Sequence, residues 1–442
     1  MKYKSKEKEN KMNLSKLKEK IKSPNLLPIL LFAVVLINYL PIIRLNFFVK
    51  TSNAIGVKEM AISLAIECVI LLIFYFKKVK LKKEMIINFF LLLGVTIISL
   101  IIQTINYFNN ELKILDLANI VCKFINVFLL YILIMGVDVE EKYIGNFMKA
   151  IIFMGIIACI QNIVLYFDDI LGHFGLVEEI KRFLPCKSFF PQKNPFAFFL
   201  YVSIISTVFL LQKENKIIYK LLLFGILGLF LFNLVLTFSR TGTAITIAFL
   251  GLFFLVTNKI DMKTKFVFLI IGAVIAVITI CQLEEYNPEL LDKLLRLDSV
   301  KTFTGRTVFW DLSKEMLEES PVNIWFGVGR FKAATLIEKY NVTQFHNTYV
   351  EFIVSGGILE LLYFLSIYIV VLIKVIRSNM KKEYKCIYIP MIITFLAYML
   401  FESLGRFSIG WSDTICMIFF ITIPLLHANS CKKVEEDCEG NE

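Results

Sequence analysis

Long apolar runs alternate with short polar connections along most of the chain. A helix needs about twenty apolar residues to cross the hydrocarbon core of a bilayer. The pattern therefore predicts an all-α fold, a polytopic membrane protein with about twelve transmembrane helices and one large, partly helical extracytoplasmic loop. The predicted spans are 24–43, 57–76, 85–105, 114–135, 147–167, 194–212, 217–237, 241–257, 265–282, 347–373, 386–403 and 411–428.

The composition argues against a water-soluble fold. Hydrophobic residues make up 57% of the 442 residues, 42 residues are Phe, and the mean hydropathy is +0.71. Charged residues are only 19%, against about a quarter in soluble domains. A folded protein in water could not hide this much apolar surface, so lipid is the expected solvent.

Basic residues lie in clusters between the apolar runs. The stretch Lys2–Lys22 contains nine Lys, and the short connection Lys77–Lys83 is also basic. Cytoplasmic loops carry such an excess of Lys and Arg, so both ends of the chain are predicted to lie in the cytoplasm of a cell-membrane protein. The net charge of +11 does not indicate nucleic-acid binding, because no groove-reading motif accompanies it.

Two predicted outer connections, 168–193 and 283–346, are longer than the others. A structureless loop as long as the second is uncommon. Apolar residues recur at helical spacing over 306–319, Pro321 is expected to stop this helix, and glycines indicate a turn at 327–329. The second loop is therefore predicted to be folded.

The predicted layout follows from these spans and connections. Its parts are a Lys-rich cytoplasmic arm at 1–23, nine transmembrane helices within 24–282, the extracytoplasmic loop at 283–346, three transmembrane helices within 347–428, and a cytoplasmic tail at 429–442.

Arg240 joins two predicted spans with almost no loop between them. A charge at the membrane edge is costly unless it is paired or faces a wet cavity, so Arg240 is a candidate functional residue. The alternative is an interface anchor whose guanidinium reaches the headgroups.

Arg306 and His346 lie at two positions of the predicted outer loop. Arg306 opens the predicted loop helix, where a guanidinium and free backbone N–H groups can bind an anion. His346 precedes the next span and could act as a general base near neutral pH. The alternatives are a solvated surface Arg and a His that serves as a helix cap or surface residue.

Together, these residues would form an outward site with two cations and one base. Such a site suits a lipid pyrophosphate donor, whose leaving charge the Arg side chains would stabilise, and a hydroxyl acceptor, whose proton the His would take. The outer loop has no acidic cluster in a metal-binding pattern, and no Cys forms a CxxC pair. No metal and no cofactor are expected.

Four short segments resemble motifs of the O-antigen polymerase and ligase superfamily of bacterial envelopes. Their order and rough spacing also agree with that family, and the twelve-span layout covers nearly the whole chain. The segments are Phe190-Pro-Gln-Lys-Asn194, Ser239-Arg240-Thr-Gly242, Gly305-Arg306 with Trp310, Pro321 and Phe326-Gly-Val-Gly-Arg-Phe331, and His346-Asn347-Thr-Tyr349 with Glu351 and Gly356-Gly357.

The resemblance implies a metal-independent enzyme related to other lipid-linked sugar transferases. It implies catalytic roles for Arg240, Arg306 and His346, and a donor glycan on undecaprenyl pyrophosphate. The other expected partners are an acceptor glycan and membrane lipid, with a chain-length regulator as a further candidate. Substrate contacts are expected from Lys193, Asn194, Arg330, Asn347, Tyr349 and Glu351.

The motifs do not separate a polymerase from a ligase that moves the glycan to a lipid A core or a protein. The Lys-, Ile- and Asn-rich composition favours a capsule or cell-wall polymerase in a Gram-positive organism. A lipid-linked oligosaccharide transporter is a competing interpretation, because Asp116 and Lys123 lie in the span 114–135. A non-catalytic envelope protein is the remaining alternative.

Overall fold

A computed structural model describes residues 83–109, 141–173, 185–258, 261–286, 306–329, 332–333, 345–404 and 415–439, with isolated residues 114, 117, 121, 125, 288 and 291. The predicted arm 1–23, the spans 24–43 and 57–76, and almost all of 114–135 lie outside these residues, as do Asp116, Lys123 and Arg330.

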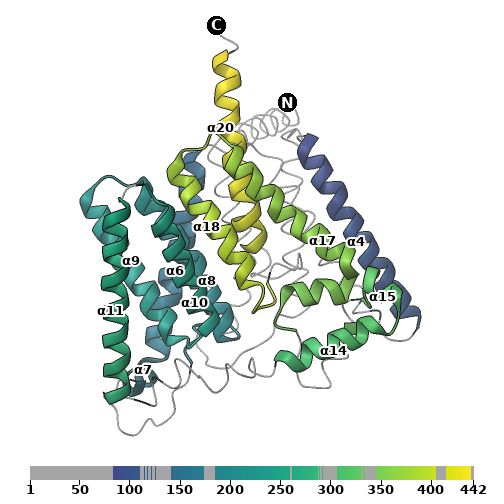
Figure 1. The fold of residues 1–442 in the computed structure, drawn as a ribbon, viewed down its shortest axis with the longest axis horizontal. Coiled ribbons are helices and arrows are strands. Elements are labelled where there is room, and N and C mark those ends of the chain that lie inside the picture. The colour runs from purple at the N-terminus through teal and green to yellow at the C-terminus, as the bar shows by residue number, and fades with distance from the viewer. Residues whose placement is uncertain are drawn as a thin grey trace, which may run out of the picture.

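The described part of the chain is helical and contains no strand (Figure 1). Its helices correspond, with shifted ends, to the predicted spans 85–105, 147–167, 194–212, 217–237, 241–257, 265–282, 347–373 and 386–403, and to the described part of the span 411–428. They are α4 (Lys83–Phe108), α6 (Glu141–Leu165), α7 (Phe167–His173), α8 (Lys193–Lys213), α9 (Ile217–Leu236), α10 (Arg240–Val256), α11 (Met262–Tyr286), α14 (Arg306–Glu318), α15 (Pro321–Phe326), α17 (Thr348–Arg377), α18 (Lys382–Tyr398), the π-helix η2 (Cys416–Thr422) and α20 (Ile423–Glu439).

Length and composition allow four of the described helices to cross a membrane: α6, α8, α9 and α17. Two apolar stretches are shorter, α10 and Cys416–Cys431. The protein is therefore a membrane protein whose described part is all-helical. The total of twelve spans stays a prediction.

Helix α8 is the centre of the bundle. It contacts α6, α9, α10 and α18, and every residue from Phe196 to Phe209 is buried. A helix that is apolar on all sides is stable when other helices bury its whole surface, as they do here. The hydroxyls of Ser203 and Ser206 donate to carbonyls one turn back, at 2.9 Å each, so burial leaves them satisfied.

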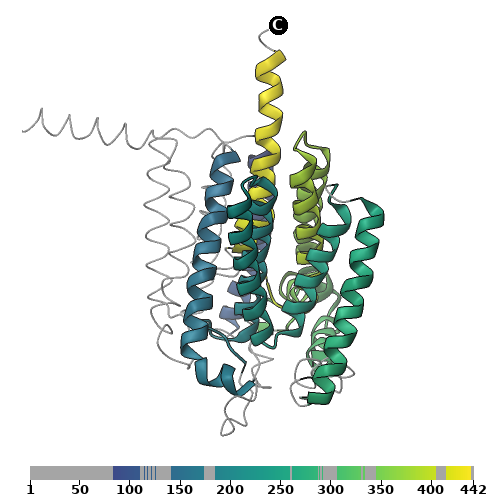
Figure 2. The ribbon, with the colours of Figure 1, turned by 90° about the vertical axis from the view of Figure 1, so that its left-hand side faces the viewer.

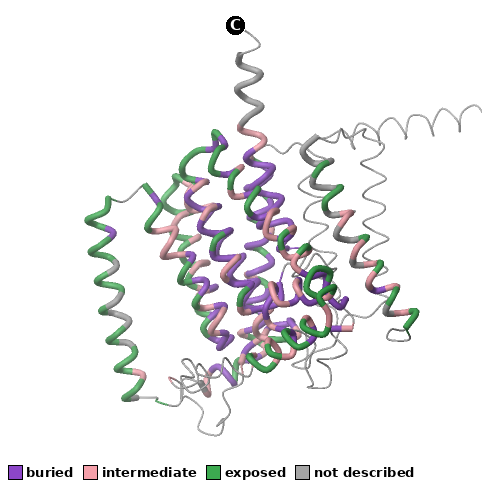
Figure 3. Tube along the Cα trace, turned by 45° about the vertical axis from the view of Figure 1, so that its right-hand side comes forward, coloured by how far each residue is buried: buried purple, intermediate pink, exposed green. Residues whose placement is uncertain are grey.

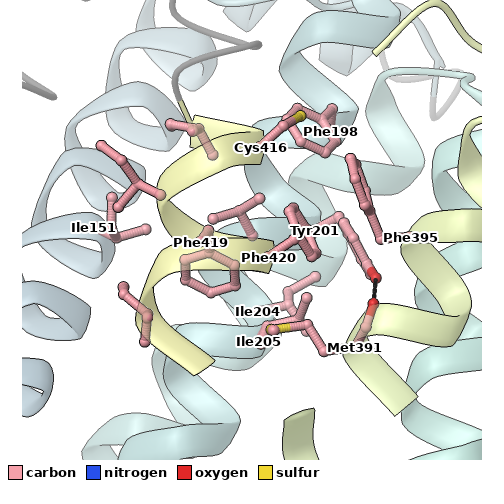
Figure 4. Packing of buried hydrophobic residues seen from close by; sticks show 14 of the residues in the cluster. Ile151, Phe198, Tyr201, Ile204, Ile205, Met391, Phe395, Cys416, Phe419 and Phe420 are labelled. Atoms are coloured by element: carbon pink, nitrogen blue, oxygen red, sulfur yellow. Dashed lines mark hydrogen bonds between the residues drawn. The ribbon is translucent and has the colours of Figure 1, made fainter. Parts of the chain in front are cut away.

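Aromatic rings join α8 to the C-terminal helices (Figure 4). The rings of Phe395 and Phe420 stack with 3.8 Å between centroids, and Tyr201 lies parallel to Phe420 at 6.1 Å. The Tyr201 hydroxyl is hydrogen-bonded to Thr394 Oγ1 at 2.7 Å, because a buried phenol needs a partner. These contacts hold α18 and η2 against α8.

Helix α11 lies at the edge of the bundle and exposes apolar side chains such as Phe266 and Phe268 (Figures 1 and 3). Lipid is a suitable solvent for that surface. Lys265 is buried and donates to the carbonyls of Leu255 and Thr257, at 2.7 and 2.5 Å, where α10 ends. A cation is favourable at this end of a helix dipole.

The predicted span 347–373 is corrected by a break in α17. Gly357 has φ 74° and ψ −170°, so 348–356 and 358–377 are two helices. The carbonyls of Val354 and Ser355, which a continuous helix would use, instead accept from Val328 N at 2.7 Å and Gly329 N at 3.1 Å. The second helix retains about twenty residues, the length that a bilayer requires.

Three other boundaries differ from the sequence prediction. Pro321 does not only stop the preceding helix but is the first residue of α15, where its missing N–H is harmless. Helix α18 ends at Tyr398, so the last part of the predicted span 386–403 is a turn. Helix α20 continues to Glu439, well into the predicted tail 429–442.

One end of the bundle gathers the short helices. Helices α7, α14 and α15 lie there, whereas the C-terminal end of α20 projects from the opposite end (Figures 1 and 2). The helices of the predicted loop are thus separated from the end of α20 by the length of the bundle. That the α14 end faces outward stays a prediction.

Candidate active site

The carboxylate of Glu402 is the centre of a polar network at the α14 end of the bundle. Glu402 follows the end of α18 and is only 5% exposed. Its Oε1 accepts from Arg306 Nη2 at 3.0 Å and from Asn194 Nδ2 at 2.7 Å. A buried carboxylate needs this combination of an opposite charge and hydrogen bonds.

Arg306 is the first residue of α14, as its position after Gly305 predicted. Besides its ion pair with Glu402, it donates from Nη1 to the Phe401 carbonyl at 2.5 Å. These contacts use two of the five N–H donors of a guanidinium. The side chain is 16% exposed, so the guanidinium is held in one orientation.

His346 lies on the other side of the same carboxylate. Its Nδ1 is 3.6 Å from Glu402 Oε2, and the described residues offer this buried nitrogen no hydrogen-bond partner within 3.5 Å. The side chain is 25% exposed. A small movement would therefore join the imidazole to the carboxylate while part of the ring stays accessible.

Asn194 extends the network to the start of α10. Its Oδ1 accepts from Ser239 Oγ at 3.0 Å, and Ser239 caps α10 by accepting from Gly242 N. A Cβ at Gly242 would lie 2.6 Å from the Ala197 Cβ, so only glycine allows α10 to approach α8 this closely. Arg240, half-buried, follows Ser239 directly and thus lies beside the network.

Residues 225–365 match the family model described as O-antigen ligase. The resemblance to the O-antigen polymerase and ligase superfamily is confirmed. No curated protein matches the chain. The O-antigen ligase match includes Arg240, Arg306 and His346, whereas Asn194 and Glu402 lie outside it.

The four segments that resemble the superfamily motifs meet at Glu402. Asn194, Ser239, Arg306 and His346 come from four different motifs, and each belongs to this network. The structure therefore brings together Arg306, His346 and Ser239, the residue directly before Arg240. Their catalytic roles stay predictions.

The positive-φ residues lie close in sequence to three segments of this network. The non-glycine residues with positive φ among those described are Ser188, Phe238 and His346, at 50°, 49° and 54°. They precede Asn194, Ser239 and Asn347. This backbone conformation costs free energy in a non-glycine residue and persists only where the surrounding structure imposes it. Such residues are found most often at functional sites.

Several residues expected to bind substrate have contacts within the protein. Lys193 Nζ donates to the Phe238 carbonyl at 3.1 Å, and Tyr349 OH donates to the Leu396 carbonyl at 2.7 Å. Asn347, rather than His346, caps α17 by accepting from two backbone N–H groups. These contacts position the backbone around the site.

Glu351 also contacts the backbone, because its Oε1 accepts from Phe345 N at 3.2 Å. This hydrogen bond holds the backbone of Phe345, the residue directly before His346. Substrate binding by Lys193, Asn347, Tyr349 and Glu351 stays a prediction.

Sequence reasoning missed Glu402. The residue fell at the end of the predicted span 386–403, where an ionisable side chain among apolar residues is itself a sign of function. Its burial and its partners depend on α18 ending at Tyr398 and on the turn that follows.

A further cation, Lys187, lies in the segment that leads into α8. Its Nζ donates to the Pro191 carbonyl at 3.2 Å. Partial burial lowers the pKa of its ammonium, because burial disfavours the charged form. The described cations near Glu402 include Arg306 and, each one residue from the network, Lys193 and Arg240.

Proposed function

We propose that this protein is a glycosyltransferase that polymerises lipid-linked glycan repeats on the outer face of the cell membrane. The donor is a glycan on undecaprenyl pyrophosphate, and the acceptor is a sugar hydroxyl of a second repeat. The products would be capsule, O-antigen or cell-wall polysaccharide. The main support is the convergence of Arg306, His346 and the Ser239–Arg240 turn on Glu402.

The Arg side chains would bind the pyrophosphate. Arg306 is fixed by Glu402 and the Phe401 carbonyl, so it does not need to reorganise when charge develops on the leaving group. Fixed guanidinium donors also match phosphate geometry better than an ammonium does. Arg240 would supply the second cation, so no metal is needed.

His346 would take the proton of the attacking hydroxyl. A hydrogen bond from Nδ1–H to Glu402 would leave Nε2 free to accept a proton, which is how a carboxylate orients a catalytic imidazole. The acceptor oxygen forms a bond to the anomeric carbon, and the bond from that carbon to the phosphate oxygen breaks. Undecaprenyl pyrophosphate leaves with the electron pair, and the hydroxyl proton goes to His346.

The test uses purified full-length protein in lipid nanodiscs with a lipid-linked repeat. Arg240→Ala, Arg306→Ala and His346→Ala should each abolish long chains while the protein still reaches the membrane. Lys314→Ala is the matched control, because Lys314 lies on the same helix as Arg306 in an exposed ion pair. Normal polymer from all three site variants would refute the enzyme proposal.

A ligase is the second candidate, because the matched family model is described as O-antigen ligase. The two functions differ only in the acceptor. Incubation with the donor and either a second lipid-linked repeat, a lipid A core or an acceptor protein separates them. Long chains on the lipid carrier support the polymerase, and glycan transfer to the core or the protein supports the ligase.

A transporter is the third candidate and would release no undecaprenyl pyrophosphate. Measuring the lipid product in the same incubation distinguishes it from both enzymes. Release that depends on His346 would support glycosyl transfer.

A further inference from the structure

Helix α15 presents an uncovered apolar surface. Val322, Trp325 and Phe326 are 61%, 53% and 42% exposed, and Ile324 is 37% exposed. No residue of the helix is charged, and none of its side chains is buried. Large apolar side chains grouped this densely indicate a contact with a partner or a membrane rather than with water.

The surface is held rigidly on the end of the bundle. Beyond α15, Val328 N and Gly329 N donate to the α17 carbonyls that the break at Gly357 leaves unpaired. A Cβ at Gly357 would lie 2.1 Å from the backbone of Trp325. Helix α15 therefore cannot turn its apolar side chains inward without breaking this contact.

The contact between α15 and α17 also indicates how deep α15 lies relative to the bilayer. The straight part of α17 begins directly after Gly357, and its first turns expose Leu359 and Leu362. These side chains lie on a helix long and apolar enough to span the membrane. Helix α15 packs where that helix begins (Figure 1). Its exposed apolar side chains are therefore close to the exposed Leu359 and Leu362 of α17.

The neighbouring helix has a different surface. Helix α14 exposes the ion pair of Lys314 and Glu318, with 73% and 63% of the side chains accessible. Charged side chains of this kind require water. Trp and Phe are favoured where the hydrocarbon region meets the headgroups. The exposed surface of α14 therefore suits water, whereas that of α15 suits lipid.

We infer that α15 is a membrane-surface anchor. Val322, Trp325 and Phe326 insert among the acyl chains of the leaflet next to the candidate active site. The partner is the bilayer, because the surface is continuous with the exposed apolar side chains of α17, a helix long and apolar enough to span the membrane. Since α14 contacts α15, the anchor would also set the depth of Arg306 relative to the headgroups.

Fluorescence of Trp325 in a bilayer tests this inference. The full chain with Trp310→Phe and Trp411→Phe keeps Trp325 as its only tryptophan. We expect lipids with brominated acyl chains to remove most of its emission, and iodide in the water to remove little. In a chain that also has Trp325→Phe, Leu362→Trp gives the lipid-facing reference and Glu318→Trp the water-facing one.

Other outcomes would overturn the inference. Strong quenching by iodide without quenching by lipid would show that α15 faces water. Protection from both quenchers would show that protein covers it, either a second copy or another segment of this chain.

Discussion

Arg306 and Glu402 form a buried ion pair with 3.0 Å between Nη2 and Oε1, although they are 96 residues apart in the chain. Arg306 begins the first described helix of the loop, and Glu402 follows the end of α18. The pair therefore fastens α14 to the bundle. It also gives the guanidinium the fixed orientation that an anion site needs.

Replacing Glu402 tests whether this carboxylate organises the site. Glu402→Ala should abolish polymer formation and destabilise the protein by about 3–5 kcal/mol, because it leaves a buried guanidinium unpaired. Glu402→Gln keeps the shape and should retain the fold with greatly reduced activity. Polymer assays and thermal unfolding in detergent measure both effects. Glu318→Gln, in an exposed ion pair, should change neither.

Arg306→Lys separates charge from geometry. Lysine keeps the charge but cannot contact Glu402 and the Phe401 carbonyl with a rigid fork. We therefore expect activity between those of Arg306→Ala and the unchanged protein, measured as the rate of chain formation. Full activity with lysine would mean that charge alone suffices.

Asn194→Asp would place a second carboxylate next to Glu402. The Asn194 amide now donates to Glu402 Oε1 at 2.7 Å, so the substitution exchanges a hydrogen bond for repulsion between like charges. We expect a loss of activity at neutral pH that is larger than for Asn194→Ala. Gln192→Glu adds the same charge at an exposed position two residues earlier and should have little effect.

Gly357→Ala tests the break in α17. A side chain in this backbone region, which is occupied almost only by glycine, costs about 1–3 kcal/mol before any clash. Its Cβ would also lie 2.1 Å from the backbone of Trp325. We expect a lower unfolding temperature and easier proteolysis of the α14–α15 segment. Gly251→Ala has open space around it and should be neutral or slightly stabilising.

Cysteine labelling of intact cells tests the side of the membrane on which the site lies. In a chain without its native cysteines, Glu318→Cys should react with a membrane-impermeant reagent, because α14 is predicted to be outside. Lys216→Cys, exposed between α8 and α9 at the opposite predicted side, should react only after lysis. The reverse pattern would invert the topology and place the site in the cytoplasm.

Much of the helical architecture can be read from the sequence because it depends on local pattern. The apolar runs predict both ends of α8, α9 and α10 within one residue, since about twenty apolar residues cannot remain in water, whereas α6 begins six residues before the predicted start at 147. Helical spacing also predicts α14. The pattern cannot locate helix ends as well, which is why the start of the straight part of α17 and the end of α18 were misplaced.

The motifs by themselves named Arg306, His346 and Asn194, but only the tertiary structure decided that one carboxylate joins them. Glu402 lies 208 residues from Asn194, and no local pattern encodes such a contact. The same holds for Gly357, because a glycine permits a break but does not require one. The break exists because two N–H groups after α15 satisfy the carbonyls that it frees.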